Sequence, residues 1–239
     1  MTKKRFRRDN KIFEEHPNYA IITSMTITTE NLFIPGPAGL LEAALHNRAT
    51  DNIAPWTMIL CHPHPLYGGT MDNKVITTLA KAGVELGCQV LRFNYRGVGQ
   101  SEGTFADAIG ECEDLHAVLN WLKALYPDLR LILCGFSFGA YIAAKIAADT
   151  PDVKALLTVS PAVLHYDFSG LKKITCPWFL IQGDADEVVP PQSVYDWLTK
   201  ANQTIHRIDF PGAGHFYHGR LMELKTVVKD YLSPLMQSE

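Results

Sequence analysis

The chain has 239 residues, of which 47% are hydrophobic and 20% are charged. This composition supplies enough apolar side chains for a sizeable core and argues against a disordered polyelectrolyte. The formal net charge of −3 argues against a protein whose main partner is nucleic acid, because phosphate binding needs a concentrated excess of Lys and Arg. We therefore expect a folded protein with no nucleic-acid partner.

The N-terminal end is basic between Lys3 and Arg8, and it lacks the continuous apolar stretch that a signal peptide needs. We expect residues 1–18 to form a flexible tail and residues 19–239 to form a single domain. No later segment offers the roughly 18 uninterrupted apolar residues of a membrane span. The sequence therefore predicts a cytoplasmic protein without a membrane span, and it leaves the oligomeric state open.

In chain order, the first expected elements are two strands, Ala20 to Ile34 and Leu40 to His46. They flank a Pro- and Gly-rich run, which predicts antiparallel pairing across a turn or short loop. Short apolar runs then alternate with longer helical stretches, a pattern typical of a parallel sheet with crossover helices. These further strands are expected at Trp56 to Cys61, Gln89 to Asn94, Leu131 to Cys134, Ala155 to Val159, Trp178 to Ile181 and Ile205 to Phe210. The expected helices are Asn73 to Leu86, Gly110 to Tyr126, Phe138 to Asp149, Gln192 to Ala201 and Arg220 to Leu232.

Two further features concern the fold class. The stretch between Val159 and Trp178 is too short to hold a large inserted cap domain, so we expect a fairly open site in an α/β fold. The cysteines are odd in number, widely scattered and without a C-x-x-C pair, so we expect most of them to be reduced core residues. They are Cys61, Cys88, Cys112, Cys134 and Cys176.

The most informative segment is Leu131 to Ala140, in which an expected strand leads through G-x-S-x-G into an expected helix. This context is the one that a nucleophile elbow requires, with glycines at the flanking positions leaving room for a close strand-to-helix passage. It predicts that Ser137 is a nucleophile. A serine hydroxyl is a weak nucleophile at neutral pH, so a base must take its proton and a third group must orient that base.

Both partners are expected later in the chain, the carboxylate before the histidine. Asp186 follows an expected strand and is the favoured acid, with Asp184 and Glu187 as alternatives. His215 follows the last expected strand in Gly-Ala-Gly-His and is the favoured base, with His218 as its rival.

The oxyanion of the reaction needs two preorganised N–H donors. One is expected from the backbone of Phe138, directly after the nucleophile. The second is expected from the loop after the strand that ends at Cys61, where His64 is favoured and Leu66 is the alternative; the two prolines of this loop have no N–H to offer.

His62 and His64 could share one face and bind a metal, but Leu66 stands where an H-x-H-x-D-H site has its aspartate. The start of a dinucleotide fingerprint at Gly97 and Gly99 also fails, because Glu102 occupies the position of the third glycine. We therefore expect no metal and no cofactor.

Three segments of the chain resemble small bacterial α/β-hydrolases related to the dienelactone hydrolase and acyl-peptidase-like branches. They are Cys61 to Lys74, Arg92 to Gly103 and Gly135 to Gly139. The resemblance implies a mostly parallel eight-stranded sheet, with the second strand antiparallel and the triad at the carboxyl ends of the strands. Dienelactone hydrolase has a cysteine nucleophile where this chain has Ser137, so its lactone substrate is not carried over. Polar residues in or after the second segment are expected to form a structural network beneath the site: Asn94, Arg96, Ser101, Glu102 and Glu111.

The sequence thus predicts a serine carboxylesterase for small or short-acyl esters, because an open site without a large cap suits small substrates. Substrate contacts are expected from four residues close to the candidate site: Leu66, Tyr67, Phe136 and Phe216. A thioesterase or peptidase would use the same triad, and a non-catalytic binding protein of this fold is the remaining alternative.

Overall fold

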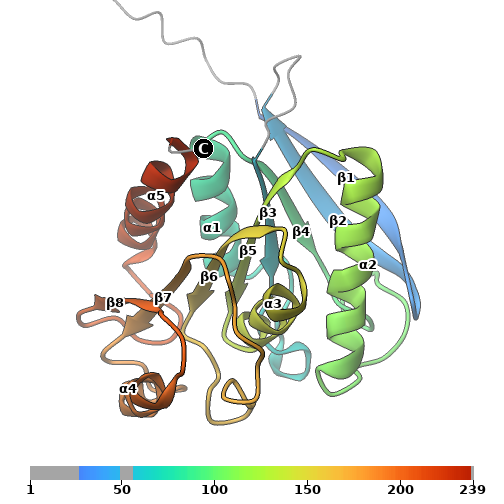
Figure 1. Cartoon of the computed structure of the whole chain (residues 1–239). Helices are drawn as coiled ribbons and strands as arrows, with labels where there is room; N and C mark the ends of the chain where they lie inside the picture. The colour runs from blue at the N-terminus through green and yellow to red at the C-terminus, as the bar shows by residue number, and fades with distance from the viewer. Residues whose placement is uncertain (1–26, 49–55, 238–239) are drawn as a thin grey trace, which may run out of the picture.

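A computed structural model describes residues 27–48 and 56–237 of the chain. The expected tail, residues 1–18, and the first part of the strand expected from Ala20 lie outside the described residues. Within the described ranges, eight strands form one sheet and five α-helices pack against it (Figure 1). The predicted α/β class is confirmed.

The sheet has the strand order β1-β2-β4-β3-β5-β6-β7-β8. β2 is antiparallel to both of its neighbours, and the other five strand pairs are parallel. This is the mostly parallel eight-stranded sheet, with an antiparallel second strand, that the resemblance implied. The strands are β1 (Ile27–Gly36), β2 (Gly39–Arg48), β3 (Trp56–Cys61), β4 (Gln89–Phe93), β5 (Arg130–Phe136), β6 (Val153–Val159), β7 (Trp178–Gly183) and β8 (His206–Phe210).

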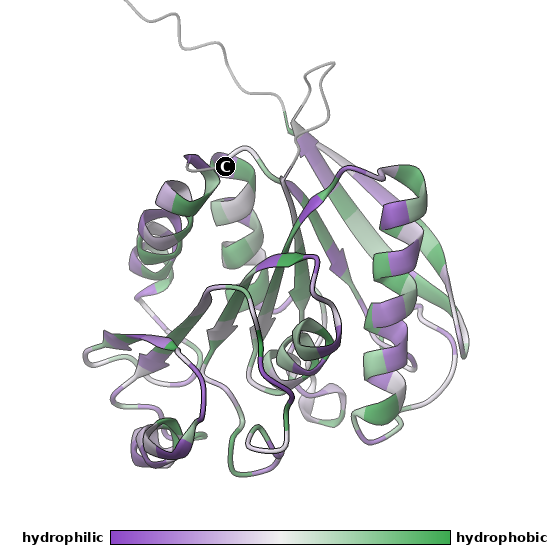
Figure 2. Cartoon of the chain, viewed as in Figure 1, coloured by the Kyte–Doolittle hydropathy of each residue, from purple (hydrophilic) through white to green (hydrophobic). Residues whose placement is uncertain are grey.

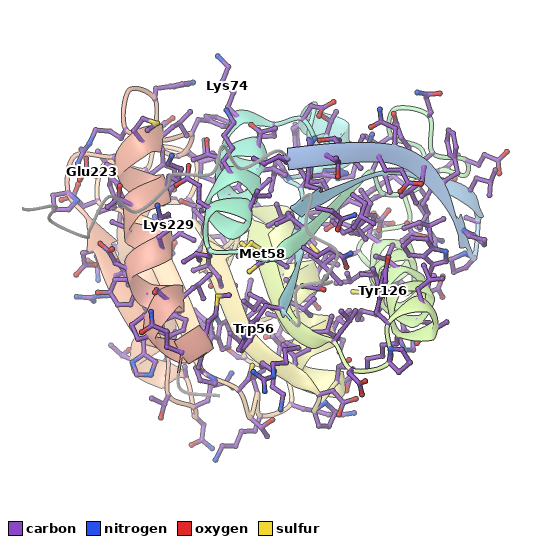
Figure 3. The ribbon with its side chains drawn as sticks, turned by 90° about the horizontal axis from the view of Figure 1, so that it is seen from above. Trp56, Met58, Lys74, Tyr126, Glu223 and Lys229 are labelled. Carbon is purple, nitrogen blue, oxygen red and sulfur yellow. The ribbon has the colours of Figure 1, made fainter. Side chains whose placement is uncertain are left out.

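Helices cover both faces of the sheet. α1 (Lys74–Glu85) and α5 (Leu221–Gln237) lie side by side on one face, as the view from above shows (Figure 3), and Lys229 of α5 forms an ion pair with Glu85 of α1. On the opposite face lie α2 (Ile109–Leu125), α3 (Phe138–Asp149) and α4 (Pro191–Lys200). None of the helices in the described ranges combines the length and apolarity that a membrane crossing requires.

The central strands consist mostly of hydrophobic residues (Figure 2), and their side chains pack into a core cluster on each face of the sheet. Met58 and Leu60 of β3 pack under α1 and α5, whereas Ile59 and Cys61 belong to the core under α2 and α3. This alternation follows from the period of two in a strand. Because the helices cover both faces, the carboxyl ends of the parallel strands remain as the open edge, where α/β proteins bind their ligands.

The structure corrects the end of the last helix. It was expected to end at Leu232, but α5 continues through Pro234 to Gln237. Leu235 and Met236 pack against the core cluster beneath α1 and α5. This tertiary packing holds the last turn in place despite the proline.

The connection between β6 and β7, residues 160–177, contains neither a helix nor a strand. No large cap domain is therefore inserted there, as predicted. The five cysteines are unpaired, and Cys61, Cys88 and Cys134 are buried in the core.

Buried polar contacts anchor the connection from β4 to α2. The Arg96 guanidinium donates to both carboxylate oxygens of Asp114, with Nη2 2.8 Å from Oδ1 and Nε 3.1 Å from Oδ2. The hydroxyl of Ser101 donates to the carbonyl of Asn94 at 2.8 Å. The remaining members of the expected network, Glu102 and Glu111, accept backbone N–H groups of Leu40 and Ala106. Each of these residues therefore makes a structural contact within the fold.

We expect Asp114→Ala to lower the free energy of unfolding by about 3 kcal/mol, because it leaves the buried Arg96 cation without its main partner. Urea denaturation would measure the loss. Asp152→Ala, which removes the exposed partner of Lys123, is the matched control and should cost less than about 1 kcal/mol. Equal losses for the two variants would contradict the role assigned to Asp114.

Candidate active site

Ser137 occupies a sharp turn between β5 and α3. Its backbone has φ 56° and ψ −115°, a positive φ that is uncommon for a residue other than glycine. The Ser137 N–H donates to the carbonyl of Val159 on β6 at 2.9 Å. A Cβ added to Gly135 would lie 2.1 Å from the carbonyl oxygen of Gly139, and one added to Gly139 would lie 2.1 Å from that of Cys61. Both glycines are therefore required by the close passage of α3 past the ends of β5 and β3.

Asp186 and His215 meet at the ends of the neighbouring strands β7 and β8. Nδ1 of His215 lies 3.0 Å from Oδ1 and 2.9 Å from Oδ2 of Asp186, and both residues are buried. The Asp186 carboxylate also accepts the backbone N–H groups of Val188 and Val189, at 3.0 and 2.7 Å, and the side-chain amide of Gln182 at 3.2 Å. Its orientation is thus fixed from three sides besides the histidine.

These contacts also determine the charge of the carboxylate. Burial by itself would raise the pKa of Asp186, but hydrogen bonds from His215 and from the Val189 N–H outweigh it and hold the pKa below its ordinary value. Asp186 is therefore an anion at neutral pH. An anion facing Nδ1 favours the tautomer that carries its proton on Nδ1, which leaves the Nε2 lone pair as the available base.

The rival residues have other contacts. Asp184 accepts the backbone N–H of Gly212, and Glu187 accepts the backbone N–H of His215 at 3.1 Å. Both carboxylates therefore fix the turn that carries the histidine, and neither contacts the imidazole. His218 is exposed, with its ring near that of Phe216.

Phe136 links the positions of Ser137 and His215. The His215 ring packs on the ring of Phe136, with centroids 4.9 Å apart, and Phe136 directly precedes Ser137. Among the described residues, no hydrogen bond joins the Ser137 hydroxyl to His215. Such bonds are often long before substrate binds and shorten in the reacting complex.

Ser137 lines a pocket of about 340 Å³. The wall comes from four connections at the carboxyl edge of the sheet, those that follow β3, β5, β6 and β7. It consists of His64, Tyr67, Ser137, Phe138, Ala162, His165, Tyr166, Val188 and Val189. Neither Lys, Arg, Asp nor Glu is among these lining residues, so the pocket suits an uncharged, mostly apolar group.

The connection after β6 also contributes to this wall, which was not predicted from the sequence. Ala162, His165 and Tyr166 belong to it, and the Tyr166 ring contacts that of Phe138 with centroids 5.2 Å apart. The sequence indicates only that this connection leaves the carboxyl end of a strand at Ser160-Pro161, and the structure places that strand next to β5.

The four expected substrate contacts lie in different places. Tyr67 lines the pocket, whereas Leu66 and Phe216 are exposed outside its wall. Phe136 is fully buried and packs against His215 and Phe216. It therefore supports the histidine and does not line the pocket, which corrects the role expected for it.

The two histidines of the loop after β3 have different environments. Nδ1 of the buried His62 donates to the carbonyl of Pro63 at 2.7 Å, and its Nε2 accepts the Tyr95 N–H at 3.2 Å. Burial lowers the pKa of His62 to about 3. His62 is thus a neutral structural residue with no free lone pair for a metal. His64 lines the pocket, and burial lowers its pKa as well.

The same loop contains the candidate second oxyanion donor. The backbone N–H of Leu66 donates to Nδ1 of His64 at 3.2 Å. The backbone N–H groups of His64 and Phe138 have no hydrogen-bond partner among the described residues. Both residues line the pocket with Ser137, and both N–H groups are free to donate to another group.

Comparisons with known proteins identify the family. The family model described as serine aminopeptidase, S33, matches residues 56–169. A solved structure described as an α/β serine hydrolase homologue from Coxiella burnetii is 45% identical to this chain, with a TM-score of 0.81. That match covers 85% of this chain and 97% of the other. The chain belongs to the α/β-hydrolase superfamily.

Two further relatives match most of the chain. A structure from Xanthomonas campestris, described as an α/β serine hydrolase without a lid, is 41% identical with a TM-score of 0.79, and the match covers 84% of this chain and 92% of the other. An uncharacterized protein of Rickettsia prowazekii is 40% identical over 210 residues, which are 84% of this chain and 87% of the relative.

We expect Gly139→Ala to cost about 3 kcal/mol of stability, because the new Cβ would overlap backbone atoms at the end of β3, which cannot move without disturbing the sheet. Gly68→Ala is the control: its φ is +78°, but nothing lies within 4 Å of the added atom. It should cost about 1 kcal/mol from backbone strain alone. Urea denaturation of both variants measures the difference, and equal midpoints would contradict the close passage described for α3.

Proposed function

We infer that this α/β-hydrolase is a serine carboxylesterase that cleaves small or short-acyl esters. The observation that carries the proposal is the buried contact of His215 Nδ1 with both oxygens of Asp186, at the same sheet edge as the strained turn of Ser137. A base oriented by an anion, together with a serine on a nucleophile elbow, is the arrangement that acyl transfer requires.

The reaction proceeds in two halves. The Ser137 hydroxyl oxygen attacks the ester carbonyl carbon while His215 Nε2 takes its proton, and the C–O bond to the alcohol then breaks as His215 returns the proton to the leaving oxygen. Water attacks the resulting acyl-enzyme with His215 again as the base, which releases the carboxylic acid and restores the serine. Asp186 stabilises the imidazolium that forms in each half.

The unpartnered backbone N–H groups of Phe138 and His64 are the proposed donors to the oxyanion. The first belongs to the N-terminal turn of α3, where backbone donors lack partners within the helix. The N–H of Leu66 is the weaker candidate, because it already donates to the His64 imidazole. Two fixed donors would stabilise the negative charge that develops on the carbonyl oxygen.

The pocket favours an ester over the alternatives that share this triad. An aminopeptidase must bind the free α-amino group of its substrate, and no carboxylate is among the residues that line the pocket. An uncharged wall and a volume of about 340 Å³ fit a small neutral acyl group. A thioester of the same acyl group would react through the same residues.

A fluorophosphonate probe tests the nucleophile. We expect the probe to modify Ser137, and Ser137→Ala to abolish both labelling and hydrolysis of p-nitrophenyl butyrate, with activity falling by at least about 10⁴-fold. Mass spectrometry of the modified peptide locates the label, and circular dichroism shows that the variant is folded. Esterase activity retained by Ser137→Ala would disprove the assignment, and a folded wild type that neither labels nor hydrolyses esters would favour a binding role.

Asp186→Asn tests the orienting anion. We expect kcat to fall by about 10⁴-fold, because an amide favours the wrong tautomer of His215. Asp184→Asn is the matched control two residues away, and it should keep kcat within about tenfold of wild type, because Asp184 contacts only the turn that carries the histidine. Steady-state kinetics on p-nitrophenyl butyrate measures both; a larger loss in Asp184→Asn would transfer the role to that residue.

A further inference from the structure

Large apolar side chains are exposed on the segments that line or adjoin the Ser137 pocket. We call five of them the apolar rim: Leu66, Tyr67, Ile109, Leu164 and Val188, which are 68%, 87%, 73%, 60% and 49% exposed. Exposing such side chains to water is unfavourable, and an exposed apolar patch usually marks a surface that meets another apolar surface. The rim therefore marks a contact surface for another apolar molecule.

The rim is continuous with the pocket. Tyr67 and Val188 line the pocket themselves, and Leu164 directly precedes the lining residue His165. Ile109 follows a turn that begins after Phe105. The Phe105 ring packs against the His64 ring, with centroids 5.0 Å apart. Four rim residues thus come from the connections after β3, β6 and β7, and Ile109 begins α2. Each lies in or next to a segment that lines the pocket or packs on a residue that lines it.

This position decides between possible occupants. A protein partner or a second copy of the chain seated on the rim would cover the entrance and exclude the ester from Ser137. A lipid aggregate would instead present ester groups to the entrance while burying the rim. An apolar rim around a reactive pocket is therefore useful to a hydrolase only if the covering surface also supplies the substrate.

Charge further defines the aggregate. The connections that carry or border the rim, residues 62–73, 94–108, 160–177 and 184–190, contain three cations. Arg96 and Lys172 pair with Asp114 and Asp149, and Lys173 directly follows Lys172. The same connections contain six exposed acidic residues: Asp72, Glu102, Asp107, Asp167, Asp184 and Glu187. An anionic membrane would be repelled by this excess of acidic residues, whereas a neutral or zwitterionic surface would not be repelled.

We propose that the apolar rim docks the protein on neutral or zwitterionic lipid aggregates and thereby gives Ser137 access to water-insoluble neutral esters. This proposal rests on the esterase function proposed above and names the physical state in which its substrates are presented. The rim side chains enter the aggregate, and the acyl group passes from the aggregate into the pocket without crossing water.

Vesicle binding and emulsion hydrolysis test the rim separately from the chemistry. The variant is Ile109→Ser/Leu164→Ser, because neither residue lines the pocket. Its matched control is Leu125→Ser/Met222→Ser, which replaces side chains that are 51% and 70% exposed at the far end of α2 and on α5. Binding is measured by co-flotation with phosphatidylcholine vesicles, and activity is measured on emulsified tributyrin and on dissolved p-nitrophenyl butyrate.

We expect the wild type and the control to float with the vesicles and to hydrolyse tributyrin faster once it exceeds its solubility limit. The rim variant should lose at least about tenfold in vesicle partitioning and in emulsion hydrolysis, because two apolar contacts are lost. It should keep kcat/KM for dissolved p-nitrophenyl butyrate within about twofold. Replacing part of the phosphatidylcholine with phosphatidylserine should weaken binding.

Three results would overturn the proposal. They are a wild type that cleaves the dissolved ester but does not bind the vesicles, a rim variant that binds as well as the control, and tighter binding to the anionic vesicles. A dimer in solution that the rim variant alone loses would assign the rim to a second copy and overturn the proposal as well. Vesicle binding needs no hydrolysis, so a failure of the esterase function would appear separately, as intact binding without cleavage of either ester.

Discussion

The backbone conformation of Ser137 is the constraint on which the rest of the site depends. A non-glycine residue with a positive φ carries a cost on the order of 1–3 kcal/mol, which persists only where the surroundings enforce it. Here the enforcing contacts are the hydrogen bond to Val159 and the tight passage that Gly135 and Gly139 allow. The same passage places the first turn of α3 against the end of β3. This one packing contact therefore positions the serine and both candidate oxyanion donors.

Backbone strain recurs along this edge of the sheet. Among the described residues, all five non-glycine positions with positive φ lie in connections at the carboxyl ends of strands: Asp107, Ala108, Ser137, Ser160 and Tyr217. Ser160 and Tyr217 meet, with their buried hydroxyl oxygens 3.1 Å apart, close to the Asp186 carboxylate. The rigid parallel sheet supports these conformations, because strands held on both sides fix where each connection begins. The strain is thus concentrated where loops from separate strands must converge on one reaction centre.

The sequence was informative wherever a local pattern determines the structure. Short apolar runs between longer helical stretches located the strands, and the glycines around Ser137 located the elbow. Both features depend on residues that are neighbours in the chain. Strand period also assigns Phe136 to the face of Ile132 and Cys134, which pack beneath α1 and α5, so its burial could have been predicted. The pocket wall from Ala162 to Tyr166 could not, because residues 160–177 have no periodic pattern and their path is set by packing against α3. The different environments of His62 and His64 likewise arise from contacts with Tyr95 and with the pocket, which the sequence does not place.

The absence of a large cap between β6 and β7 has a consequence for the loops themselves. In a capped enzyme, separate residues can shield the apolar substrate path from water. Here the connections after β3, β6 and β7 must form both the inner wall and the outer surface, and Tyr67 and Val188 do both at once. Apolar side chains that form the pocket wall therefore extend into solvent at the mouth of the pocket. The apolar rim is the outer margin of the pocket, which is why the physical state of the substrate, and not its acyl group alone, is expected to govern the rate.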